Sequence, residues 1–79
     1  MKESKIFKNK LKEILNQLSF KKKFINDISK GLDSMQMFYL ISKIESKFKI
    51  KIKDEYIDER NFKNLGTIIK IIEKLKNDK

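Results

Sequence analysis

Apolar residues recur at steps of three and four in three separate segments of the chain, the spacing of one face of an α-helix. In residues 2–19 the stripe consists of Phe7, Leu11, Ile14, Leu15 and Leu18. In residues 34–47 and just beyond, it consists of Met35, Phe38, Ile41, Ile44 and Phe48, with Leu40 beside it. In residues 64–76 a broader face consists of Leu65, Ile68, Ile69, Ile71, Ile72 and Leu75. These stripes predict three long helices around one core.

Polar residues mark where these helices start. Ser4, Ser34 and Asn64 are of the types that cap helix N-termini, so we place a cap at each. Gly66 costs up to about 1 kcal/mol relative to alanine in a helix, so the first turn of the last helix is expected to fray. Residues 77–79 are expected to be a loose tail.

The size of the chain favours a helical bundle. The 79 residues form one domain, 1–79, and contain no cysteine, so neither a disulfide nor a cysteine metal site can support the small core. A helical bundle suits so small a chain, because most of its contacts are between residues close in sequence. We therefore predict an all-α fold, a small four-helix bundle with three long helices and one short helix.

The connection between the first two helices is long. Residues 20–33 carry apolar side chains without a clean period, so we expect this segment to pack against the bundle and to end at a pivot, Gly31. The lysines at 21–23 favour a solvated loop over a small anion-binding patch.

The connection to the last helix has two parts. Ile50 and Ile52 alternate with lysines, but no second strand is available to pair with them, so we expect a loop that inserts both isoleucines into the core. Residues 54–62 predict one or two short helical turns, with Asp58 as a cap and Phe62 as the anchor.

A serine stands at the entrance to the second helix, in the run Gly31-Leu32-Asp33-Ser34-Met35. A serine needs a base partner to act as a nucleophile, and the absence of His and Cys excludes a triad or a thiol site. An exposed hydroxyl at a helix N-terminus is instead suited to carry a group, since the helix dipole there favours an attached phosphate. The alternative is that Ser34 serves only as the helix cap.

The pattern around this serine resembles the acyl carrier protein family, over residues of about 24–72. The resemblance includes the motif itself, the apolar positions that follow it, the spacing of Ile50 and Ile52, and a segment made of Asp54, Glu55, Ile57, Asn61 and Phe62. This last segment resembles that of small discrete carriers of polyketide, peptide or aminoacyl pathways more than that of the fatty-acid type.

The resemblance implies that the protein is not an enzyme. It implies a 4′-phosphopantetheine arm on Ser34, attached from coenzyme A by a phosphopantetheinyl transferase, and an acyl or aminoacyl thioester on that arm. Asp33 would supply an oxygen ligand to the Mg²⁺ of the transferase, with Gly31, Leu32 and Met35 as the motif around the site. The further partners implied are a loading enzyme and downstream acyl-transfer enzymes, and the carrier is expected to be a monomer without a metal of its own.

The chain departs from the family in the charge of its second helix. Carriers usually present several carboxylates there, whereas here Glu45 is the single acidic residue on the expected face. We therefore expect partners to dock through Met37 and Tyr39, and the predicted partner-binding set is Gln36, Met37, Tyr39 and Lys43. The alternative is that Met37 and Tyr39 are ordinary exposed apolar residues of the surface. Glu45 and Asp54 are interpreted as solvated charges.

The formal net charge of +9 raises the question of an acidic partner. The lysines are spread along the chain and Arg60 is its single arginine, so compositional drift is favoured over nucleic-acid binding. No signal-peptide core and no membrane-spanning run is visible, and we expect a cytoplasmic protein that binds neither nucleic acid nor membrane. A carrier fold that is no longer modified, and a small basic nucleic-acid-binding protein, remain as alternatives.

Overall fold

The computed structural model describes the backbone of residues 2–77 and the side chains of residues 5–77. The described residues contain three α-helices, α1 (Lys2–Gln17), α2 (Ser34–Phe48) and α3 (Leu65–Asn77). Three short 3₁₀ helices lie in the connections, η1 (Lys22–Phe24), η2 (Ile28–Gly31) and η3 (Asp54–Tyr56). No strand occurs in this part of the chain, so the prediction of an all-α fold is confirmed.

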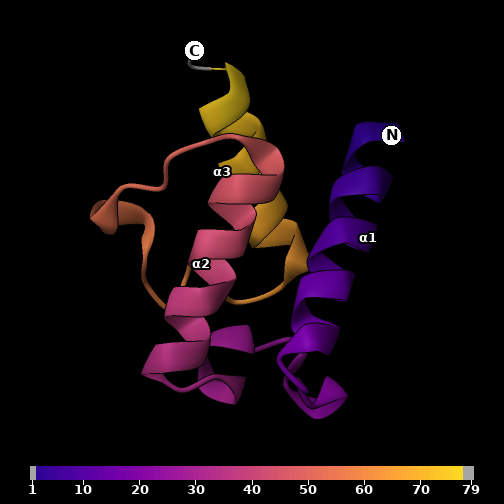
Figure 1. The fold of residues 1–79 in the computed structure, drawn as a ribbon, viewed down its shortest axis with the longest axis vertical. Helices are drawn as coiled ribbons and strands as arrows, with labels where there is room; N and C mark the ends of the chain where they lie inside the picture. The colour runs from indigo at the N-terminus through magenta and orange to yellow at the C-terminus, as the bar shows by residue number, and fades with distance from the viewer. Residues whose placement is uncertain (1, 78–79) are drawn as a thin grey trace.

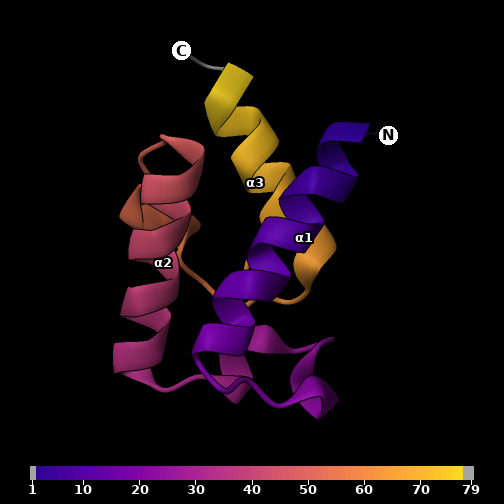
Figure 2. The ribbon, with the colours of Figure 1, turned by 45° about the vertical axis from the view of Figure 1, so that its right-hand side comes forward.

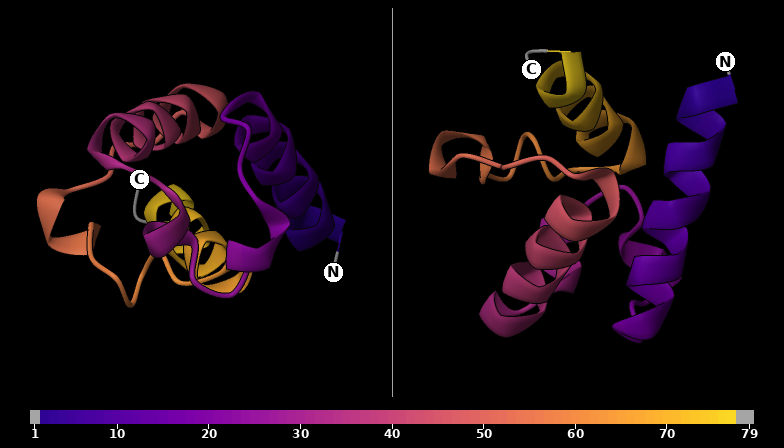
Figure 3. Two further views of the ribbon diagram at one scale, coloured as in Figure 1. Left: turned by 90° about the horizontal axis from the view of Figure 1, so that it is seen from below. Right: turned by 45° about the horizontal axis from the view of Figure 1, so that its top comes forward.

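The three α-helices surround one core. α1 contacts both α2 and α3. α1 begins and α3 ends at the same end of the molecule, whereas η1 and η2 lie at the other end, beside the start of α2 (Figures 1 and 2). Seen from below, α1 and α2 lie on one side of the molecule and α3 lies on the other, while η3 projects outward beyond α2 (Figure 3).

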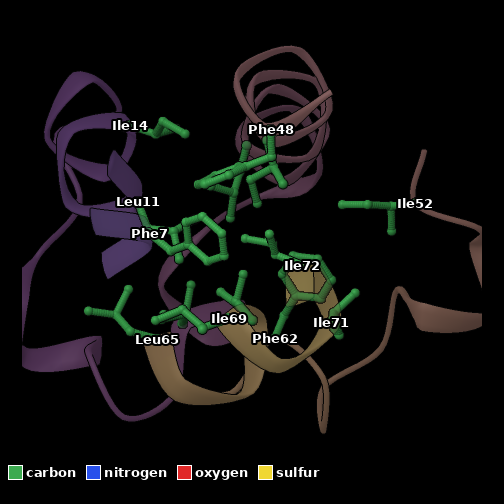
Figure 4. Close-up of a cluster of buried hydrophobic side chains, with 14 of the residues drawn as sticks. Phe7, Leu11, Ile14, Phe48, Ile52, Phe62, Leu65, Ile69, Ile71 and Ile72 are labelled. Carbon is green, nitrogen blue, oxygen red and sulfur yellow. The ribbon is translucent and has the colours of Figure 1, made fainter. Parts of the chain in front are cut away.

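The core is made of apolar side chains from all three helices and from the connections, and none of its buried residues is polar or charged in the described part of the chain. The side chains converge between the helices (Figure 4). At its centre the ring of Phe7 meets that of Phe48 edge-on, with the centroids 5.0 Å apart. Such edge-to-face pairs add about 1 kcal/mol to the free energy gained by burial.

The buried face of α2 differs from the predicted stripe. Leu40, Ile44 and Phe48 are buried as expected, but Met35 is 78% exposed and Phe38 is 70% exposed. Each residue advances about 100° around a helix, so nine residues bring Met35 to about 180° from Ile44. Each three-residue step falls about 60° short of a full turn, so residues spaced only by threes do not stay on one face of the helix. Met37, which packs partly buried against the core, belongs to the buried face instead.

The helix ends differ in part from the predicted ones. Asn64 caps α3 as predicted, because the Thr67 N–H donates to Asn64 Oδ1 (3.0 Å) and the Asn64 N–H donates to Thr67 Oγ1 (3.1 Å). Gly66 is helical and lies inside the first turn that this reciprocal pair closes. Ser4 is not a cap, because the helix already includes Lys2. Asn77 is helical rather than part of a tail, and residues 78–79 lie outside the described residues.

Two helices end in residues with left-handed backbone. Ser19 follows α1 with φ 57°, and the Phe20 N–H donates to the Leu15 carbonyl (3.1 Å). Lys49 follows α2 with φ 56°, and the Ile50 N–H donates to the Glu45 carbonyl (3.2 Å). Both ends have the hydrogen bond of a Schellman cap, although glycine usually occupies the left-handed position.

The connection from α1 to α2 packs against the bundle as expected, but Gly31 is not a pivot. Its φ is not positive. A Cβ on Gly31 would lie 2.7 Å from ring atom Cε1 of Phe20 and 2.7 Å from Cβ of Phe24. Glycine is therefore required here by close packing of two aromatic side chains. The Ile28 N–H donates to the Lys63 carbonyl (2.8 Å), which fixes this connection to the segment before α3.

The connection from α2 to α3 matches most of its prediction. Ile50 and Ile52 are buried in a loop. The Asn61 N–H donates to Asp58 Oδ1 (2.8 Å), and Phe62 is 1% exposed, so the cap and the anchor are confirmed. The short helix expected here is a three-residue 3₁₀ turn, so the described residues contain three α-helices and not four.

Candidate attachment site at the start of helix α2

Ser34 is the first residue of α2 and is exposed. The prediction that Ser34 caps this helix is wrong, because Asp33 is the cap. Asp33 Oδ1 accepts from the Gln36 N–H (2.8 Å), and Gln36 Oε1 accepts from the Asp33 N–H (3.0 Å). This reciprocal pair is a capping box with Asp and Gln as its members. It satisfies two backbone donors without using the serine.

The capping box leaves the Ser34 hydroxyl without a hydrogen-bond partner among the described residues. No histidine or cysteine exists in the chain to deprotonate it. The hydroxyl is therefore accessible, and no described side chain is placed to activate it as a nucleophile.

Gln36 also joins two helices. Its Nε2 donates to the Leu18 carbonyl at the end of α1 (3.2 Å), while its Oε1 completes the capping box. Both ends of the side chain amide are thus occupied inside the molecule. Gln36, one of the residues predicted to bind partners, therefore fixes the start of α2 to the end of α1.

Tyr39 and Lys43, also predicted to bind partners, lie on the side of α2 that faces α1. The Tyr39 hydroxyl donates to Gln17 Oε1 (3.4 Å), and the Lys43 ammonium lies 5.3 Å from the centroid of the Tyr39 ring. Both side chains stay partly accessible. Their contacts with each other and with α1 make them part of the flank of the bundle.

The exposed apolar surface beside Ser34 is formed by Met35 and Phe38. Sequence reasoning assigned both residues to the core and assigned Met37 to the surface, and the structure reverses these assignments. The angular position of each residue around a 3.6-residue helix would have separated the two sets. The buried face is narrow and consists of Met37, Leu40, Ile44 and Phe48. Met35 and Phe38 lie outside it.

A shallow open hollow of about 430 Å³ adjoins Ser34. Its lining residues come from η2, α2 and the segment after η3; they are Ser29, Leu32, Asp33, Ser34, Met37, Phe38, Ile41 and Ile57. A second hollow of about 260 Å³ shares Ser29, Met37 and Ile57 with it and extends to Phe62. The Ser29 hydroxyl is buried at this position without a hydrogen-bond partner. Together the two hollows form a mainly apolar groove that starts at Ser34.

Glu45 is not the solvated charge that was predicted. Its Oε2 accepts from the Ile52 N–H (2.8 Å) across the turn that follows α2. This bond fixes the loop that carries Ile50 and Ile52 into the core. Asp54, the other carboxylate interpreted as solvated, is exposed at the start of η3.

The described residues hold no group of three or more His, Cys, Asp or Glu side chains close enough to bind a metal ion. None of the helices in the described part of the chain has the length and apolar character to cross a bilayer. Comparison with known proteins found no matching family model, no matching curated protein and no matching solved structure.

Proposed function

We propose that this protein is an acyl carrier protein whose Ser34 hydroxyl is the attachment point of a 4′-phosphopantetheine arm. The observation that carries the proposal is the division of roles at the start of α2. Asp33 and Gln36 cap the helix, and the serine beside them keeps an exposed hydroxyl without an internal partner. A serine needed only for helix stability would be expected to make the capping hydrogen bond itself.

The surroundings of Ser34 suit a phosphodiester. The first backbone N–H groups of a helix have no partner within the helix, and the dipole adds positive potential there. Oδ1 of Asp33 is occupied by the cap, while its Oδ2 makes no hydrogen bond with the described residues. That oxygen is available to a Mg²⁺ ion held by a phosphopantetheinyl transferase, since Mg²⁺ prefers carboxylate and phosphate oxygens.

When bound, the arm would supply a thiol that holds an acyl or aminoacyl group as a thioester. The chain's own contribution is to fix the attachment point at the mouth of the groove lined by Met37, Ile41 and Ile57. Tethering there raises the effective concentration of the carried group at a docked enzyme. The carrier-like arrangement is part of this proposal, with η3 and the following turn in the position of the short helix.

The proposed partners are the transferase, a loading enzyme and downstream acyl-transfer enzymes. Met35 and Phe38 extend from the first turns of α2 beside Ser34, and they replace Met37 and Tyr39 as the docking residues that we propose. Apolar contact suits this face, because the carboxylate of Glu45 is engaged with the Ile52 N–H.

The test is the intact mass of the protein after incubation with coenzyme A, Mg²⁺ and a transferase of broad specificity. We expect one phosphopantetheinyl group on the wild type, located on Ser34 by fragmentation. Ser34→Ala should show no addition. Ser46→Ala, which removes another exposed serine of α2, should be modified like the wild type. An unmodified wild type with several transferases would count against the proposal.

A further inference from the structure

A second groove lies on the side of α1 that faces away from α2. The side of α1 towards α2 is occupied by contacts: the Lys10 ammonium lies 5.6 Å from the ring centroid of Phe48, and Glu13 pairs with Lys47 at 3.7 Å. On the other side, α1 borders the connection around η1 and the start of α3. Two hollows, of about 380 Å³ and about 390 Å³, open there.

The two hollows form one continuous groove, because both are lined by Lys12 and Ile25. The first is lined by Lys8, Lys12, Ile25, Asn26, Asn64, Leu65, Gly66 and Ile69. The second is lined by Lys12, Leu15, Asn16, Phe20, Lys22 and Ile25. We call this surface the basic groove. It shares no lining residue with the groove at Ser34.

The charge of the basic groove has one sign. Its lining includes Lys8, Lys12 and Lys22 and no carboxylate. All three lysines are exposed, and none of them makes an ion pair or a ring contact with the described residues. Their positive charges are therefore not neutralised within the described part of the molecule.

The floor of the basic groove is apolar. Leu15 and Ile69 are buried at its base, while Phe20 and Ile25 are partly exposed and pack against the core. Amide side chains of Asn16, Asn26 and Asn64 complete the rim. An apolar floor with a basic rim is complementary to an elongated ligand that has apolar side chains on one face and carboxylates beside them.

We propose that the basic groove binds an acidic amphipathic helix of a partner protein. Lys8 and Lys12 are four residues apart on α1, which places them one turn, about 6 Å, apart along the axis. Carboxylates at positions i and i+4 of a partner helix have the same spacing. Such a helix would place apolar side chains over Phe20 and Ile25 while its carboxylates meet the lysines.

The form of the groove favours a helix over two other anionic ligands. A hollow receives a protruding ridge, whereas a bilayer presents a flat surface. The rim has lysines and no arginine, and arginine is the residue whose planar group best reads phosphates and bases. The proposal does not depend on the modification of Ser34, which lines the other groove.

The test uses two synthetic helical peptides that differ in one feature. The first has glutamates at i and i+4 with two leucines on the same face, and the second has serines in place of the leucines. Each is titrated into the full ¹⁵N-labelled chain. With the first peptide we expect amide shift changes at Lys12, Asn16, Ile25 and Gly66, and none at Met35 or Phe38. The second should bind at least tenfold more weakly.

Two triple variants that remove the same charge distinguish binding in the basic groove from general attraction to the positive charge of the protein. The triple variant Lys8→Gln, Lys12→Gln, Lys22→Gln should bind the first peptide about tenfold more weakly, given the modest strength of each exposed pair. The control triple variant Lys51→Gln, Lys53→Gln, Lys63→Gln removes the same charge from exposed positions elsewhere and should change the affinity less than twofold.

The proposal would be overturned by an equal loss in the control variant, by shift changes centred outside the basic groove, by equal binding of the peptide without leucines, or by the absence of any shift changes. A single-stranded RNA oligonucleotide or vesicles containing phosphatidylglycerol that perturb the groove at lower concentration than the peptide would replace the helix with a different class of ligand.

Discussion

At the scale of single residues, the start of α2 separates helix capping from chemistry. Asp33 and Gln36 exchange two hydrogen bonds, and Gln36 also reaches the end of α1. Ser34, between them in sequence, contributes to neither bond. The consequence is that substitutions of Asp33 can distinguish its structural role from the role that we propose for it with a transferase.

We expect Asp33→Ala to lower the free energy of unfolding by about 1 kcal/mol, because it removes the acceptor for the Gln36 N–H. Asp33→Asn keeps an acceptor oxygen and should be within about 0.5 kcal/mol of the wild type. Urea denaturation followed by circular dichroism measures both.

In the transferase assay, however, Asp33→Asn should react more slowly than the wild type, since it lacks the charge offered to Mg²⁺. A normal rate for Asp33→Asn would remove the carboxylate from the proposed site.

At the scale of elements, the rotation of α2 about its axis decides which residues meet a partner. The face with Leu40, Ile44 and Phe48 turns inward, which leaves Met35 and Phe38 exposed next to Ser34. Gln36 and Tyr39 are engaged with the end of α1. Because this exposed surface is apolar, docking to it should respond weakly to salt.

We expect Met35→Ser and Phe38→Ser to weaken binding to the loading enzyme by several-fold or more, through loss of buried apolar area. Ser42→Ala, at another exposed position of α2, serves as the control and should bind normally. Affinity measured between low and high ionic strength should fall only mildly, since exposed ion pairs contribute about 0–1 kcal/mol each and are screened by salt. Steep salt dependence with normal affinity of both serine variants would contradict apolar docking.

At the scale of the whole molecule, one small core supports all three α-helices and both long connections. Phe48 is central to it: the ring is 3% exposed and packs edge-on against Phe7. Its carbonyl accepts from the Lys76 ammonium of α3 (3.3 Å). A chain of this size has little stability to lose, about 5 kcal/mol in total.

Phe48→Ala should therefore cost about 3–5 kcal/mol and unfold a large part of the population at room temperature. Phe38→Ala makes the same chemical change ten positions earlier in α2, where the ring is 70% exposed, and should stay within about 0.5 kcal/mol of the wild type. Thermal and urea denaturation of the two variants compares them directly. Similar losses in both would mean that the two faces of α2 are assigned wrongly.

Features that depend on neighbours a few residues away could be predicted from the sequence. Three helical segments, the cap at Asn64, the turn at Asp58 and the burial of Ile50 and Ile52 could be predicted, because period, capping chemistry and alternation act over short distances. The position of a serine at the entrance to the second helix was also visible in the sequence.

The remaining features depend on contacts between elements that are distant in the sequence. α2 has apolar residues on two faces. The face with Ile44 is buried in the common core, whereas Phe38 on the other face stays in solvent. Gly31 gained its role from two rings that fold over it, and lysines distant in sequence, Lys12 and Lys22, came to line one groove. Burial is a property of the whole assembly, so the local pattern left each of these outcomes open.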